Sequence, residues 1–288
     1  MRYLDPKNDL IFKKVFGQHP HLLISFLNAL LPLKSPIVSV EYLPHELAPE
    51  IPVLKHSIVD VRCKDQNGRH FIVEMQMLWT PSFKSRVLFN ASKVYISQLD
   101  RGRDYNVLHP VYALSLVNEI FEKDTDDFYH HYSIVHTQFP DRRLEGLEFV
   151  FVELPKFKPQ NLSDKKMQVL WLRYLTEIQD NSEVVAPELL ENSVINEAVT
   201  YLQESAFSKA ELAGYDRYWD SISTEVTLYN GATQKGFDNG LEKGIEKGIE
   251  TGELNKAMDI ARQMKLEGLP NSLIIKLTGL SEGDLENL

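Results

Sequence analysis

The chain has 288 residues, of which 43% are hydrophobic, and this length and composition exclude an intrinsically disordered protein. Its net charge of −10 is unevenly distributed. Residues 1–120 carry 14 Lys and Arg against 11 Asp and Glu, whereas residues 121–288 carry 17 against 30. The first part is therefore better suited to contact nucleic-acid phosphates, and the acidic second part is equally well explained as a solvated helical surface.

The cysteine content and the N-terminal sequence bear on the compartment. A single cysteine, Cys63, excludes an internal disulfide bond and is typical of a reducing compartment. No apolar run approaches the roughly 20 residues of a membrane span. The first ten residues, MRYLDPKNDL, lack the apolar segment of a signal peptide. We therefore expect a cytoplasmic protein without a membrane partner.

The predicted elements alternate between helices and strands in the first part of the chain. Apolar residues at helical spacing predict two short helices between residues 9 and 31, separated by Gly-Gln-His-Pro. Pro81 and Ser82 are typical of a helix start, so we expect a helix over residues 81–99. Apolar runs predict strands over residues 36–43, 55–63, 70–77, 109–120, 132–139 and 147–154. The predicted fold is an α/β mixed sheet flanked by helices.

The sequence changes character after Pro159, because helical patterns replace strand patterns from Ser163 onward. We therefore predict three parts: a core over residues 1–160, a helical extension over residues 161–232, and a C-terminal part over residues 233–288. The third part opens with a glycine at every fourth position and ends with two short predicted helices.

The C-terminal part raises two questions about partners. Five glycines from 236 to 252 need a reason, because each costs ~1 kcal/mol in a helix. They would let a second helix approach closely and form a homodimer, or they belong to a polar linker. The final residues, SEGDLENL, stand where a helix-turn-helix has its recognition helix, but their acidity opposes contact with phosphate. We expect a small packing or partner-binding cap there.

A predicted hairpin places Asp60 on its first strand and Glu74 and Gln76 on its second. Side chains alternate between the faces of a strand, so the loop length decides whether the two carboxylates share a face. A two-residue loop at Asn67-Gly68 would separate them. A three-residue loop, with Gly68 in the left-handed conformation, would put Asp60 opposite Glu74.

The second register has a chemical consequence. Two carboxylates about 5 Å apart on one face repel each other, and need solvent, a shared proton or a divalent cation. Oxygen ligands suit Mg²⁺ or Mn²⁺. Gln76, which lies opposite Ile58 in this register, could orient a water molecule. The alternative is an ordinary sheet whose polar face meets solvent.

The chain resembles the PD-(D/E)xK nuclease superfamily in the spacing of Asp60 and Glu74, although Gln76 stands where that superfamily usually has lysine. It resembles one of its families, the recombination-promoting nucleases and transposase-like proteins, in DPKNDLIFKKVFG, in EMQM, in FKSRVLFNASKVYISQLDRGRDYNVLHPVYALSLVN and in the glycine-spaced tail. The resemblance covers nearly the whole chain. It implies a restriction-endonuclease-like fold and Mg²⁺-dependent DNA endonuclease activity linked to recombination or mobile elements.

By position, the resemblance implies that Asp60 and Glu74 bind the metal, that Gln76 orients water and that Asp9 helps to complete the site. A water or hydroxide would then attack the phosphorus in line. The rival hypothesis is a non-catalytic DNA- or protein-binding assembly protein on the same fold. Carboxylates on opposite faces of the hairpin would favour that rival.

Because Gln76 carries no charge, positive charge near the phosphate must come from another residue. The cations of interest are Lys13, Lys14, Arg86 and Lys93. Arg86 and Lys93 are seven residues apart, so they share one face of a helix and could flank the phosphate. We expect Lys13, Arg86 and Lys93 to contact DNA.

Overall fold

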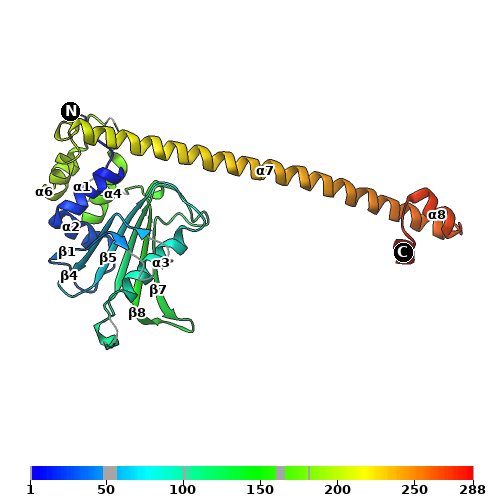
Figure 1. Cartoon of the computed structure of the whole chain (residues 1–288), viewed down its shortest axis with the longest axis horizontal. Helices are drawn as coiled ribbons and strands as arrows, with labels where there is room; N and C mark the ends of the chain where they lie inside the picture. Colours follow the sequence, from blue (N-terminus) through cyan, green and yellow to red (C-terminus); the bar gives the residue numbers. More distant parts are fainter. Residues whose placement is uncertain are drawn as a thin grey trace. The chain divides into compact units, whose positions relative to one another are not determined.

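The computed structural model (Figure 1) describes residues 2–47, 57–99, 102, 104–159, 166–180 and 182–287. Contacts divide the chain into two compact units, Met1–Ile222 and Ser223–Leu288. The first unit holds a six-stranded mixed sheet flanked by helices, which confirms the predicted fold class. Among the helices that are described, none carries an apolar stretch long enough to cross a lipid bilayer.

The strands of the first unit are β1 Val40–Tyr42, β2 Glu46–Leu47, β3 Ser57–Ile58, β4 Val61–Asp65, β5 His70–Gln76, β6 Val111–Val117, β7 Tyr129–His136 and β8 Phe139–Glu153. The large sheet has the order β1-β4-β5-β6-β8-β7, whereas β2 and β3 form a separate pair. Strands β5, β6 and β8 run parallel, and the remaining pairs are antiparallel.

The α-helices are α1 Asp9–Gln18, α2 Pro20–Leu30, α3 Phe83–Ile96, α4 Met167–Glu177, α5 Pro187–Leu190, α6 Ser193–Thr200, α7 Lys209–Leu266, α8 Asn271–Thr278 and α9 Glu282–Glu286. The described residues also include the short 3-10 helices η1 Tyr105–Val107, η2 Leu154–Lys156 and η3 Glu204–Ala206. The paired helices predicted before residue 31 and the helix predicted after Pro81 are therefore confirmed.

The two faces of the sheet are covered by different helices, and β5 shows how the sequence assigns them. Phe71, Val73 and Met75 pack into the cluster that contains α1, α2, α4 and α6. Ile72 packs into the cluster that contains α3. Because side chains alternate along a strand, Glu74 and Gln76 belong to the α3 face.

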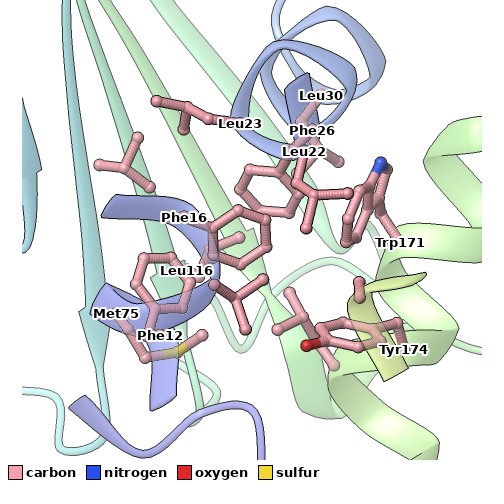
Figure 2. Packing of buried hydrophobic residues seen from close by; sticks show 14 of the residues in the cluster. Phe12, Phe16, Leu22, Leu23, Phe26, Leu30, Met75, Leu116, Trp171 and Tyr174 are labelled. Carbon is pink, nitrogen blue, oxygen red and sulfur yellow. The ribbon is translucent and has the colours of Figure 1, made fainter. Parts of the chain in front are cut away.

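Aromatic packing fixes α1 against the sheet and against α2 and α4 (Figure 2). The ring of Phe16 lies 4.4 Å from that of Phe26 and 5.4 Å from that of Trp171, measured between centroids. Phe12 adds a tilted contact with Phe16 at 4.7 Å. Such offset and tilted pairs are favourable beyond the area they bury, so α1 is a rigid carrier for its polar residues.

The DPKND motif builds the start of α1. The Asn8 side chain caps the helix by accepting from the Leu10 N–H at 3.0 Å, and it donates to the Tyr215 carbonyl at 3.3 Å. The buried Lys7 ammonium lies 2.9 Å from Asp5 and donates to the Leu175 carbonyl at 3.1 Å. These motif residues have a structural role, because they tie the N-terminus to α4 and α7.

The hairpin between β4 and β5 has the three-residue loop. The Asp65 N–H donates to the Arg69 carbonyl at 3.0 Å, which closes the loop over residues 66–68. Gly68 has a φ of 77°, and a Cβ added there would lie 2.7 Å from the ring of His109. The left-handed backbone conformation therefore favours glycine at this position, and a larger side chain would also displace the His109 ring.

This loop sets the register, in which Val61 pairs with Val73. Continued by one step, this register sets Asp60 opposite Glu74, although Asp60 itself lies just before β4. The predicted register of the hairpin is thus confirmed as far as Val61 and Val73.

The prediction that Ile58 faces Gln76 is wrong. The chain bends at Asp60, so the single strand expected over residues 55–63 is divided, and Ile58 pairs with Glu46 instead. The Asp60 carboxylate accepts the Met75 N–H at 2.6 Å. A side chain thus satisfies this N–H where the strand pairing ends.

The helices α4 to α6 pack in the same core as the sheet, within the first unit. Residues 160–165, where the sequence changes character, lie outside the described residues. The three-part division by residue number stays a prediction.

Candidate active site

A cavity of about 770 Å³ lies between the last residues of β5 and the first turns of α3. It brings together four of the predicted site residues, Asp60, Glu74, Gln76 and Arg86. The sheet therefore presents its polar residues at the carboxyl end of a parallel strand, which is where open α/β sheets commonly bind ligands.

One oxygen of the Asp60 carboxylate accepts a backbone hydrogen bond, and the other lies near a lysine ammonium. Its Oδ2 accepts the Met75 N–H, and its Oδ1 lies 3.9 Å from the Lys13 ammonium. Burial raises the pKa of the Asp60 carboxyl to about 7, with the Met75 hydrogen bond opposing that rise. The charges of Asp9 and Glu74 raise this pKa further, and Lys13 lowers it.

Glu74 is buried, and its carboxylate accepts hydrogen bonds from side chains of α3. Its Oε1 takes the Asn90 amide N–H at 3.0 Å, and its Oε2 lies 3.5 Å from the Arg86 guanidinium. Burial raises the pKa of the Glu74 carboxyl, because it outweighs both of these contacts. Asn90 was missed in the sequence, although it lies four residues after Arg86 on a predicted helix.

Gln76 is engaged by its neighbours. Its Oε1 accepts from Arg86 at 2.5 Å, and its Nε2 donates to the Leu78 carbonyl. The guanidinium of Arg86 thus links Glu74 and Gln76, so positive charge lies beside the position at which the resemblance places lysine.

Lys13 approaches the same acids from α1. Its ammonium lies 2.7 Å from Asp9 and 3.9 Å from Asp60. Helical spacing explains the first contact, since Asp9 and Lys13 are four residues apart. Asp9 therefore reaches the site through Lys13.

The other two cations have different partners. Lys14 forms an ion pair with Glu211 at 3.1 Å and lies over the Phe207 ring at 3.8 Å. Lys93 donates to the Leu47 carbonyl at 2.7 Å and lies 5.3 Å from the centroid of the Phe89 ring. Of the two candidate cations on α3, Arg86 lines the cavity and Lys93 does not.

The donor set fits a hard divalent cation with few protein ligands. Within the described part of the chain, no group of three or more His, Cys, Asp or Glu side chains forms a metal cluster. Asp60 and Glu74 supply two carboxylates, which is the number that Mg²⁺ often takes when waters and phosphate oxygens complete its shell. Their pKa values are raised by the same first cause, burial, which outweighs the lowering effects of Lys13 on Asp60 and of Arg86 on Glu74.

Without divalent metal, Asp60 should make the protein less stable as the pH rises. Its ordinary pKa is 3.8 and its folded-state pKa is about 7, so the folded state binds more protons between these values. Stability is therefore retained at low pH and lost as the pH rises from about 4 to about 7. In EDTA, we expect Asp60→Asn to raise the melting temperature at pH 7.5 by roughly 2–4 °C, which corresponds to about 1 kcal/mol.

The control for this prediction is the same pair of proteins at pH 5, where the difference in melting temperature should shrink. Adding Mg²⁺ at pH 7.5 should stabilise the original protein and leave Asp60→Asn unchanged. A variant that melts below the original protein at pH 7.5 would show that the Asp60 carboxylate stabilises the fold.

Two family models match the chain. The model described as "PD-(D/E)XK nuclease family transposase" matches residues 6–226. The model described as "Rpn/YhgA-like nuclease family, C-terminal HTH domain" matches residues 254–288. There α8 and α9 pack with the end of α7 around a core of Ala261, Ile274, Leu280 and Leu285. This match identifies a helix-turn-helix domain and so corrects our expectation of a small packing or partner-binding cap.

No curated protein and no solved structure matches the chain. The first family model nevertheless covers well over half of the sequence, including the whole hairpin, the cavity and the helix α3 that lines it. The resemblance found in the sequence is thereby confirmed, and the chain belongs to the PD-(D/E)XK nuclease family transposases.

Proposed function

We propose that the protein is a metal-dependent DNA endonuclease that hydrolyses phosphodiester bonds, linked to recombination or mobile elements, and acts in the cytoplasm. The observation that carries this proposal is the pairing of two carboxylates, Asp60 and Glu74, with Arg86 in one cavity. Membership of a nuclease family and the C-terminal helix-turn-helix, a common DNA-binding module, support the same conclusion.

Asp60 and Glu74 would hold Mg²⁺ or Mn²⁺. A divalent cation bound there would polarise the phosphodiester and assist the formation of hydroxide for in-line attack. The Met75 N–H and the Asn90 amide fix the two carboxylates, so that little reorganisation is needed on binding.

The cations on either side of the acids have separate tasks. Lys13, on α1, lies near Asp60 and would stabilise negative charge that develops on the phosphate. Arg86, on α3, would hold a phosphate oxygen and keep the Gln76 amide in place for a water molecule. Lys93 lies farther along α3 and would contact the DNA backbone outside the cavity.

The direct test is incubation of the purified full chain with supercoiled plasmid in Mg²⁺, in Mn²⁺ and in EDTA. Nicked or linear plasmid should appear with the metals and not with EDTA. If DNA is bound but remains intact under all three conditions, the chain is a non-catalytic DNA-binding protein on the same fold.

We also propose a homodimer through the glycine-spaced part of α7. Five glycines recur every four residues from Gly236 to Gly252, and an added Cβ would meet nothing at any of them. Exposed Ile245 and Ile249 directly follow Gly244 and Gly248, so they lie about 100° farther around the helix and extend the face beside the glycines. A second copy could cover this face, which would bring two nuclease sites together for cutting both strands of a duplex.

Light scattering at micromolar concentration tests the dimer. Leucines in place of Gly240, Gly244 and Gly248 should shift the protein from dimer to monomer, because bulky side chains keep the helices apart. The matched control replaces Asn239, Glu246 and Glu250, which lie on the side of the helix away from both the glycines and the two isoleucines, with leucine and should leave the dimer intact. A monomeric original protein, or equal dimerisation of the glycine variant, would identify the segment as a linker.

A further inference from the structure

An aromatic side chain, Phe89, lies in the cavity of the two carboxylates without serving the hydrophobic core. It is 41% exposed and lines the cavity together with Glu74 and Arg86. The core-facing side of α3 is formed by other residues, namely Phe83, Val87, Asn90, Ala91 and Val94. Phe89 is therefore not required for packing α3 against the sheet.

The surroundings of Phe89 combine apolar surface with positive charge. Ile58, from β3, is 63% exposed and lines the same cavity. The ammonium of Lys93 lies over the Phe89 ring, 5.3 Å from its centroid. Arg86 precedes Phe89 by three residues and Lys93 follows it by four, so cation, ring and cation lie along one side of α3.

The order Arg86, Phe89, Lys93 offers binding groups for each part of an unstacked nucleotide. Guanidinium and ammonium groups bind phosphates, and an aromatic ring between them binds the flat face of a base. In a regular duplex, neighbouring bases already cover those faces. A ring beside the scissile phosphate can therefore stack only where a base is unpaired or splayed from the helix.

Resting on the proposed nuclease function, we propose that Phe89 stacks on an unpaired base next to the scissile phosphate. The favoured substrates are then DNA molecules with unpaired nucleotides, such as bulges, flaps or single-stranded gaps. The base occupies the ring face that Lys93 leaves open, and Ile58 supplies further apolar contact. Phe89 is thus a specificity-determining residue that acts on substrate choice.

The test measures binding without cutting. The full chain carrying Asp60→Asn is mixed in Mg²⁺ with a matched duplex, and separately with the same duplex containing a two-nucleotide bulge with 2-aminopurine. We expect tighter binding of the bulged DNA and quenching of 2-aminopurine by stacking. Adding Phe89→Ala should weaken binding of the bulged DNA about tenfold and leave binding of the matched duplex unchanged.

Two variants in the same background serve as controls. Phe89→Trp should keep the preference for bulged DNA, because indole also stacks. Leu88→Ala removes an exposed apolar side chain next to Phe89 that does not line the cavity, and it should also keep the preference. A Phe89→Ala protein that still prefers bulged DNA, or an absence of any preference in the parent, would overturn the stacking role.

The two proposals fail separately. If the original protein cuts plasmid and Phe89→Ala does not change substrate preference, the nuclease proposal stands and the stacking role is wrong. If no DNA is cut but the preference depends on Phe89, stacking stands and the catalytic function is wrong.

Discussion

Asp60→Asn and Glu74→Gln should each lower the rate of plasmid nicking at least about 100-fold, which is the scale of loss when one preorganised electrostatic group is removed from an active site. Both substitutions preserve shape and remove the negative charge that a divalent cation requires. Asp60→Asn keeps an oxygen that can still accept the Met75 N–H, so the bend before β4 should survive.

The measurement is the initial nicking rate in saturating Mg²⁺, accompanied by circular dichroism to show that each variant is folded. Glu145→Gln is the matched control, because this exposed carboxylate pairs with Lys34 and does not line the cavity. Its nicking rate should equal that of the original protein. Wild-type activity in either Asp60→Asn or Glu74→Gln would exclude the proposed metal site.

The hairpin shows which features could be predicted from the sequence alone and which could not. Its alternating pattern predicted both strands, and a glycine that follows asparagine indicated a turn. It could not choose between two-residue and three-residue loops, because both are compatible with Asn67-Gly68. The structure shows the three-residue loop held by the Asp65 carboxylate, which accepts the N–H groups of Asn67 and Arg69 at 3.0 and 2.9 Å.

The cations show where prediction from sequence spacing fails. The seven-residue spacing of Arg86 and Lys93 correctly placed both on one helix, yet Lys93 donates to the Leu47 carbonyl outside the cavity. Lys13 and Asp60 are separated by 47 positions and meet only because α1 packs on the sheet. Helical periodicity fixes a face, whereas tertiary packing decides which neighbour that face meets.

The C-terminal tail illustrates a different limit. The negative charge of SEGDLENL disfavours contact between that segment and phosphate. Charge does not determine, however, whether a helix-turn-helix forms. Its geometry comes from apolar packing around Ile274, Leu280 and Leu285 and from Gly279, which has a φ of 73°. The fold of this module is therefore encoded by its apolar spacing and its turn glycine.

Lys13→Met should lower the nicking rate about 100-fold at saturating Mg²⁺. Its ammonium lies 3.9 Å from the Asp60 carboxylate, and the flexible lysine side chain can follow charge that develops on the phosphate. Methionine keeps most of the apolar length of lysine, so α1 should remain packed. Lys14→Met is the matched control on the same helix, since Lys14 faces Glu211 and Phe207.

A metal titration separates this role from simple screening of the acids. Lys13 also neutralises Asp9, so its removal places additional negative charge near Asp60 and should strengthen metal binding. If Lys13 stabilises charge on the phosphate, Lys13→Met stays slow at every Mg²⁺ concentration, although half-saturation occurs at a lower one. If the nicking rate of Lys13→Met instead recovers fully as Mg²⁺ is raised, Lys13 acts only by balancing the carboxylates. Arg86, which lines the cavity, is then the better candidate for the role of the superfamily's lysine.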